Sequence, residues 1–100
     1  MEIKIQKNDQ DTLVRFIGDL DTAATTEQTE ELQTVLSLAD KNLVIDGTDL
    51  EYISSAGLRF LMQLKRETES KGGSVKITHL NEDVSDIFRM SGFNNIFTVE

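Results

Sequence analysis

Two short alternating stretches at the start of the chain predict a pair of antiparallel strands. Ile3 and Ile5 alternate with charged and polar neighbours, which is the pattern of a half-exposed strand. A polar turn at residues 8–10 follows, and a second strand pattern runs over residues 12–17. Two strands joined by so short a turn favour a hairpin. We expect the second strand to end at Gly18.

Three helical patterns follow, each with a set of mostly apolar residues expected to face inward; the first set has helical spacing and the second forms a wide apolar face. Asp21 or Thr22 can cap the first helix, and Asn81 can cap the third. The second helix follows two serines, Ser54 and Ser55. In order, the three stripes are Ala24, Gln28, Leu32, Val35, Leu36 and Ala39; Leu58, Phe60, Leu61, Met62 and Leu64; and Val84, Ile87 and Phe88.

The segments between the helices have the patterns of short strands. Residues 43–45 form a continuous apolar run, which is typical of a buried central strand. Val75 and Ile77 alternate with polar neighbours, and residues 95–99 indicate a short final strand. Strands separated by single helices favour parallel neighbours. The chain is therefore predicted to be one compact α/β domain over residues 1–100, with an N-terminal hairpin, a mixed sheet of about five strands and three main helices.

Beyond the last helix, Gly92 and Phe93 have the pattern of a helix end. Glycine readily adopts the left-handed conformation that closes a helix, and an apolar residue after it often folds back on the last turn. We expect Gly92 to be left-handed and Phe93 to contact the third helix.

Composition narrows the classes of function. Lys and Arg total 10 and Asp and Glu total 18, giving a net charge of −8, which disfavours contact with phosphate backbones or anionic lipids. The chain has no cysteine, so it has neither disulfides nor thiolate metal sites. Its apolar runs are too short to cross a bilayer, and it starts with no signal-peptide pattern. We expect a soluble, cytoplasmic protein that neither binds nucleic acid nor inserts into a membrane.

The most distinctive stretch is LVIDGTDLEYISSAGL, over residues 43–58. It reads as a buried strand, a short acidic connection and two serines where a helix begins. A hydroxyl in that place is a helix cap at minimum, and a phosphate there would be well accommodated. Neither serine begins a capping box, and Gly57 is a poor choice for the first helical turn. A glycine there indicates that something approaches the backbone closely.

This stretch resembles the STAS domain family, and within it the small anti-sigma factor antagonists. In that family a strand ending in Asp leads through a short loop to a serine at a helix start, followed by Gly-Leu. Aligned on residues 57–58, the family's phosphorylatable serine falls on Ser55. Many members have Asp immediately before that serine, whereas this chain has Ser54, which is therefore the second candidate for the phosphate.

The resemblance also implies a partner-binding face. The family has a Gly-x-Leu-Asp segment near the phosphorylated helix start, and residues 18–21 match it. We expect Gly57 to lie against the partner, so that Gly57→Arg leaves the fold intact but excludes the partner. The face carried over from the family comprises Asp21, Thr22, Ser54, Ser55, Gly57 and Leu58.

The function implied by the resemblance is a switched binding module. The unmodified protein binds an anti-sigma factor and so frees the sigma factor. In the family that partner is typically also an ATP-dependent serine kinase, and a serine phosphatase restores the binding form. The protein itself performs no chemistry and needs no cofactor.

Two other functions stay open. The chain can be a noncatalytic STAS subunit of a transporter complex or of a larger signalling assembly. It can also be a receiver-like or phosphate-handling protein in which Asp46, with Asp19, Asp21 and Asp49, binds Mg²⁺. The receiver pattern needs an acidic pair after the first strand, which this chain lacks, and the only histidine, His79, is expected in a surface loop. We expect instead that Asp46 orients the loop after it and that no metal binds.

Overall fold

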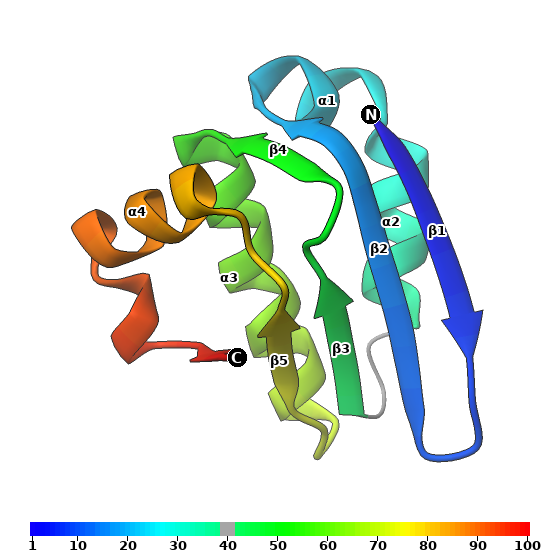
Figure 1. Cartoon of the computed structure of the whole chain (residues 1–100). Coiled ribbons are helices and arrows are strands. Elements are labelled where there is room, and N and C mark those ends of the chain that lie inside the picture. The colour runs from blue at the N-terminus through cyan, green and yellow to red at the C-terminus, as the bar shows by residue number, and fades with distance from the viewer. Residues whose placement is uncertain (39–41) are drawn as a thin grey trace.

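The chain folds into a mixed sheet, with the helices of residues 22–37 and 55–70 packed behind it and the helix of residues 82–91 toward the front (Figure 1). The structure is a computed structural model, and it describes residues 1–38 and 42–100. In chain order the elements are β1 (Glu2–Lys7), β2 (Asp11–Leu20), α1 (Thr22–Glu27), α2 (Thr29–Ser37), β3 (Asn42–Asp46), β4 (Leu50–Ile53), α3 (Ser55–Ser70), β5 (Val75–Thr78), α4 (Glu82–Ser91), a 3-10 turn η1 (Phe93–Asn95) and β6 (Thr98–Val99).

The predicted α/β architecture is confirmed, with one more strand than expected. The described part of the sheet has six strands in the order β1-β2-β3-β5-β6, and β4 pairs with β2. β1 and β2 form the predicted antiparallel hairpin, with Ile3 opposite Phe16. The pairs β2–β3, β3–β5 and β5–β6 are parallel. The additional strand, β4, lies in the segment that the sequence indicated only as an acidic connection.

β2 continues past Gly18, so the expected end of this strand is wrong. Residues 11–15 of β2 pair with β3, whereas residues 18–20 pair with β4. The register shifts between Gly18 and Asp19. Gly18 has φ +104°, a backbone conformation that residues with a Cβ rarely adopt. The Gly18 N–H donates to the Asp49 carbonyl oxygen at 2.9 Å. This bulge transfers β2 from one parallel neighbour to the next.

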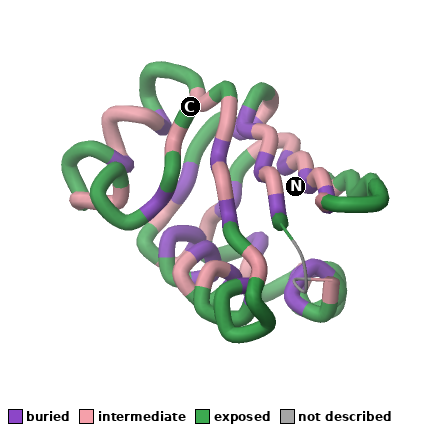
Figure 2. Tube along the Cα trace, turned by 90° about the horizontal axis from the view of Figure 1, so that it is seen from below, coloured by how far each residue is buried: buried purple, intermediate pink, exposed green. Residues whose placement is uncertain are grey.

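The core lies between the sheet and the helices behind it, where the buried segments of neighbouring elements face one another (Figure 2). Val14 and Phe16 on β2 are fully buried, and the Phe16 ring meets the Phe60 ring of α3 edge-on at 6.5 Å. Leu61 and Leu64 extend the same face of α3. The wide apolar stripe predicted for this helix therefore forms the contact with the sheet.

The helix expected after Asp21 is broken into α1 and α2 at Gln28. Gln28 has φ −110° and ψ 33°, outside the helical region. The Thr29 hydroxyl donates to the carbonyl oxygens of Thr25 and Thr26, at 3.3 and 3.0 Å. Such local bonds offer the backbone an alternative to a regular helix. Ala24, Leu32, Val35 and Leu36 are buried as predicted, and Ala39 lies outside the described residues.

The predicted start and end of α4 are confirmed. The Asn81 Oδ1 accepts from the Val84 N–H at 2.8 Å, and Gly92 is left-handed with φ +80°. Phe93 folds back so that its ring lies 5.9 Å from the ring of Phe88. The final strand is shorter than expected, because η1 takes up residues 93–95 before β6.

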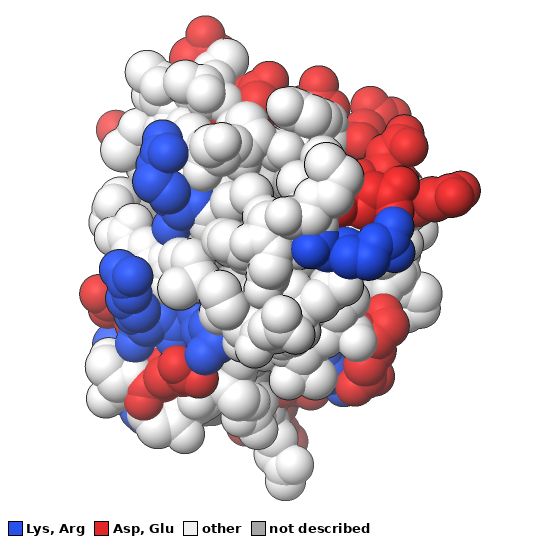
Figure 3. Space-filling model, turned by 90° about the vertical axis from the view of Figure 1, so that its left-hand side faces the viewer, with Lys and Arg blue, Asp and Glu red and all other residues white. Residues whose placement is uncertain are grey.

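Charged side chains are unevenly spread over the side of the molecule that carries α4 (Figure 3). Lys and Arg form separate groups within a largely uncharged surface, and acidic side chains gather toward one margin. α4 itself begins with Glu82 and Asp83 and holds an ion pair between Asp86 and Arg89.

No helix within the described residues has the length and apolarity that a membrane span requires.

Candidate functional site

The ends of β2 and β4 bring two distant segments of the chain together. The two strands are parallel, with Leu20 opposite Ile53. Beyond this pair, the Ser54 N–H donates to the Leu20 carbonyl oxygen at 3.1 Å. The loop into α1 and the loop into α3 therefore start side by side, and they hold the residues predicted for a partner-binding face.

The two adjacent serines do different things. Ser54 is the N-cap of α3: its backbone is extended, and its Oγ accepts from the Gly57 N–H at 3.3 Å. Its carbonyl oxygen accepts from the Leu58 N–H at 2.9 Å. Ser55 is the first residue of α3, and its side chain is exposed. Within residues 1–38 and 42–100 the Ser55 hydroxyl has no hydrogen-bond partner, so no bond in the described structure depends on it.

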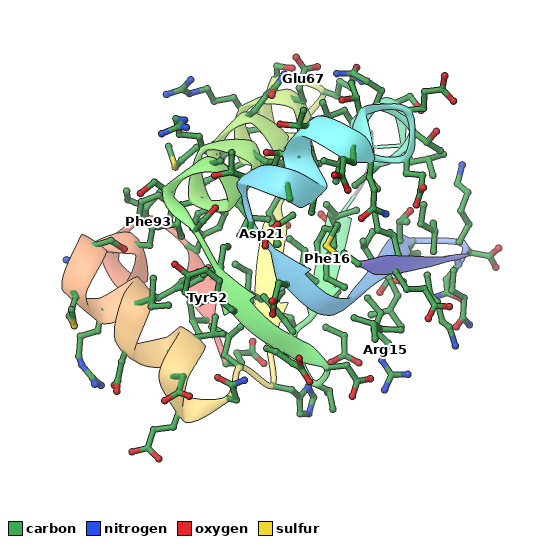
Figure 4. All side chains as sticks on the ribbon, turned by 90° about the horizontal axis from the view of Figure 1, so that it is seen from above. Arg15, Phe16, Asp21, Tyr52, Glu67 and Phe93 are labelled. Atoms are coloured by element: carbon green, nitrogen blue, oxygen red, sulfur yellow. The ribbon has the colours of Figure 1, made fainter. Side chains whose placement is uncertain are left out.

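Asp21 and Thr22 begin α1 beside this helix start. Asp21 lies at the junction of β2 and α1, and its Oδ1 accepts from the Ala24 N–H at 2.9 Å (Figure 4). The predicted cap is therefore confirmed, and it is Asp21 rather than Thr22. Thr22 is exposed. That both residues contribute to a partner-binding face stays a prediction.

Gly57 is buried, and the group close to it belongs to the chain itself. A Cβ at this position would lie 2.3 Å from the Leu20 carbonyl oxygen and 2.8 Å from Cγ1 of Ile53. Only glycine lets the start of α3 pack so closely against the ends of β2 and β4. The expectation that Gly57→Arg leaves the fold intact is therefore wrong. Leu58 is also buried, with 9 % of its surface exposed, and belongs to the core.

A groove beside Ser55 contains apolar side chains that the sequence did not single out. It has a volume of about 380 Å³ and lies between β4, the start of α3 and α4. Tyr52 is 48 % exposed and Met90 is 84 % exposed, which is unusual for side chains of this size. Tyr52 lies in the stretch that the sequence predicts to be an acidic connection, so no strand pattern marks it. The exposure of Met90 could have been predicted, because Met90 falls outside the buried stripe of α4. The groove is lined by Tyr52, Ile53, Ser54, Ser55, Leu58, Ile87, Met90 and Ser91.

Asp46 orients the loop after β3, as predicted. Its Oδ1 accepts from the Thr48 N–H at 3.0 Å and from the Thr48 hydroxyl at 2.5 Å. The hydroxyl contact is the main cause that lowers the pKa of Asp46; partial burial opposes it, and the Thr48 N–H, Arg15 and His79 add to it. His79 is exposed with φ 60°, in keeping with a surface loop.

The carboxylates near Asp46 are arranged around an arginine rather than around a metal site. Arg15 points to the opposite side of β2 from Phe16, away from α1, α2 and α3 (Figure 4). Its Nη2 lies 2.7 Å from Oδ2 of Asp49, and its Nε lies 4.0 Å from Oδ2 of Asp46. In the part of the chain that the structure describes, no three His, Cys, Asp or Glu side chains are grouped so that they could hold a metal ion.

Comparison with known proteins gives consistent matches over almost the whole chain. Residues 2–100 match the family model of the STAS domain. A protein of Bordetella bronchiseptica named "Putative anti-sigma factor antagonist BtrV" is 28% identical over 99 residues, covering 99% of this chain and 85% of that protein. The anti-sigma-B factor antagonist of Bacillus subtilis is 25% identical over 101 residues, covering 99% of this chain and 90% of that protein.

Solved structures with the same fold include antagonists and a transporter. The anti-sigma factor antagonist SpoIIAA in its unphosphorylated form has a TM-score of 0.76 at 16% identity, covering 99% of this chain and 88% of that chain. Its phosphorylated form has a TM-score of 0.69 at 16% identity, covering 99% and 91%. The murine anion transporter Slc26a9 has a TM-score of 0.71 at 16% identity, over 87% of this chain but only 14% of the transporter. At such identities these likenesses show the fold alone.

Proposed function

The chain belongs to the STAS domain family, and we propose from this that it acts as an anti-sigma factor antagonist. In its unmodified form it binds an anti-sigma factor in the cytoplasm and thereby frees the sigma factor. Two relatives support this proposal, because both are named as antagonists and both align with 99% of the chain. The protein acts by binding, without chemistry or a cofactor of its own.

The exposed hydroxyl of Ser55 is the observation that carries the proposed switch. A serine kinase, which is the anti-sigma factor itself, phosphorylates Ser55, and a serine phosphatase reverses the modification. Ser55 can be modified without disturbing the fold, since its hydroxyl holds nothing in place within the described residues. Ser54 is the poorer phosphorylation site, because its Oγ already accepts a hydrogen bond from the Gly57 N–H and caps α3.

The same phosphate has opposite effects on the free domain and on the complex. It adds about −1.5 to −2 charges at pH 7. At an exposed helix start that charge is favourable by about 0.3–1 kcal/mol, so the domain stays folded. In a docked interface the phosphate loses its hydration and is repelled by acidic side chains of the partner. Together these effects cost on the order of several kcal/mol of binding free energy. Each 1.4 kcal/mol corresponds to about a tenfold loss of affinity.

The partner-binding face consists of exposed groups around this helix start. Thr22 and Ser55 present their side chains to solvent, and Asp21 and Ser54 lie next to them. The groove that contains Tyr52 continues this face toward α4. Gly57 supports the face from below and does not contact the partner.

Phosphosite mapping tests the switch directly. The protein is incubated with ATP and the anti-sigma factor that co-purifies with it, and the phosphate is located by mass spectrometry. We expect it on Ser55, with Ser55→Ala resistant to phosphorylation but still bound and Ser55→Asp bound weakly. Ser54→Ala is the matched control and should still be phosphorylated. Phosphate on Ser54 alone would move the site by one residue, and phosphate on neither serine would overturn the proposal.

A noncatalytic role in a transporter or a larger signalling assembly is the second candidate. The fold shared with part of Slc26a9 favours it. Affinity purification from the source cells separates the two, since the antagonist recovers a small ATP-binding anti-sigma factor and the subunit recovers a membrane protein or a large assembly.

A further inference from the structure

We propose that Arg59 is the intramolecular partner of the phosphate on Ser55, and this inference rests on the proposed function. Ser55 and Arg59 are four residues apart on α3, and both are exposed. Residues at this spacing are neighbours on a helix surface. Side chains in a helix lean toward its N-terminus, so a long side chain at position 59 can reach back over the first turn toward Ser55. An anion placed N-terminal to a cation at this spacing is the favourable order.

Arg59 is free to take an anion. Within the described residues it has no ion pair and no hydrogen bond through its guanidinium. By contrast, two other basic side chains already have partners: Arg15 pairs with Asp49, and Lys65 on the same helix pairs with Glu69 at 2.7 Å. Arg59 lines a groove of about 220 Å³ between α3 and the first two helices, and no acidic side chain lines that groove in the described structure.

The helix start offers the phosphate only some of its N–H groups. Two N–H groups of its first turns are already bonded, Gly57 to the Ser54 Oγ and Leu58 to the Ser54 carbonyl oxygen. The carboxylate of Asp21 lies on the adjoining loop, in a chain whose net charge is −8. A phosphate therefore gains from a cation, and a guanidinium can bind it through two parallel hydrogen bonds.

The position of Arg66 makes it a matched control for Arg59. Arg66 is also exposed on α3 and, within the described residues, also without an ion pair. It lies eleven residues beyond Ser55, which is about 16 Å along a helix. Removing its charge changes the net charge as much as removing that of Arg59, but it does so out of reach of the phosphate.

The test measures the ionisation of the phosphate itself. Phosphoserine is incorporated at position 55 during translation, and its second pKa, ordinarily about 6, is followed by ³¹P NMR across pH 4.5–8. We expect Arg59→Gln to raise this pKa by about 0.3 unit or more, because the dianion loses its partner. Arg66→Gln should leave it within about 0.1 unit, and Arg59→Lys should keep part of the effect. In 0.5 M NaCl the difference should shrink.

Either of two results would overturn the inference. One is a phosphate pKa that is the same in the unsubstituted chain and in Arg59→Gln. The other is an equal pKa shift in Arg59→Gln and Arg66→Gln, which would indicate only the effect of the net charge of the protein. Circular dichroism of each variant confirms that it is folded. Because the phosphate is installed without a kinase, failure of phosphorylation by the anti-sigma factor would refute the proposed function alone, and this titration would still decide the role of Arg59.

Discussion

Single side chains at the start of α3 determine how firmly the helix is anchored. The Ser54 hydroxyl caps the helix, the Ser55 hydroxyl is exposed, and the missing side chain of Gly57 admits the Leu20 carbonyl oxygen. Stability and the proposed modification therefore depend on different residues, and substitutions can separate them.

The two serines should differ in their effect on stability. Ser54→Ala removes the cap and should lower the free energy of unfolding by about 1 kcal/mol. Ser55→Ala removes an exposed hydroxyl and should change it by less than about 0.5 kcal/mol. Urea denaturation of both variants measures the difference. Equal losses would mean that the cap is shared or assigned to the wrong serine.

Gly57 should tolerate no side chain. Gly57→Ala places a Cβ against backbone, which cannot move aside as a flexible side chain can, and should cost about 2 kcal/mol or more. Gly57→Arg should fail to fold. Gly72→Ala adds a methyl group where nothing lies within 4 Å, so its cost comes only from the positive φ of Gly72 and is the level that Gly57→Ala should exceed. Chemical denaturation gives the comparison, and a Gly57→Ala variant as stable as the parent would contradict the packing described at this position.

At the scale of elements, the site depends on how β2 is divided between β3 and β4. The bulge at Gly18 turns the end of β2 toward β4, and the pairing with β4 places Ser54 beside Leu20. This arrangement was not readable from the sequence. Residues 50–53 are too few, and too mixed in exposure, to show a strand period, and the glycine looks like a strand end. The long stripe of α3 and the caps of α4 were readable, since periodicity and cap residues are local signals.

Gly18→Ala should loosen β4 as well as strain the backbone. Gly18 and Gly72 both have positive φ, at +104° and +86°, so alanine should cost about 1 kcal/mol at either position. Only Gly18→Ala should also speed hydrogen exchange in the β4 amides, because only that glycine lies at the junction of β2 with β4. Hydrogen exchange followed by mass spectrometry distinguishes the two variants. Unchanged β4 protection in Gly18→Ala would show that the bulge does not hold β4.

The connection from β3 to β4 should be sensitive to acid. The pKa of folded Asp46 lies below its ordinary value of 3.8, so the folded state favours the ionised carboxylate. Its contribution to stability is therefore fully present above about pH 4 and is lost as the pH falls through the folded pKa. Asp46→Asn should flatten the fall in unfolding free energy below pH 4. Thr48→Val, which keeps the carboxylate but loses the hydroxyl donor, should flatten it in part; a curve identical to that of the parent for both variants would contradict the assignment.

At the scale of the whole molecule, the class of fold and the place of the candidate site are easier to predict from the sequence than the shape of the surface around that site. Alternation, helical stripes and caps locate the hairpin, α3 and α4. The break at Gln28 and the exposure of Tyr52 were not predictable, because they depend on how elements distant in sequence meet. For the same reason Gly57 signalled a close approach without showing what approaches.

The hydrogen bond between Ser54 and Leu20 also has a consequence for the newly made chain. In the folded chain the start of α3 is fixed against residues 18–20 through the pairing of residues 50–53 with them. Contacts between such distant segments form late, because the intervening loop must first close. A kinase that recognises the folded helix start would therefore pass over nascent or misfolded copies. Only molecules that have completed folding would then be phosphorylated, and the ratio of modified to unmodified protein would reflect the folded molecules alone.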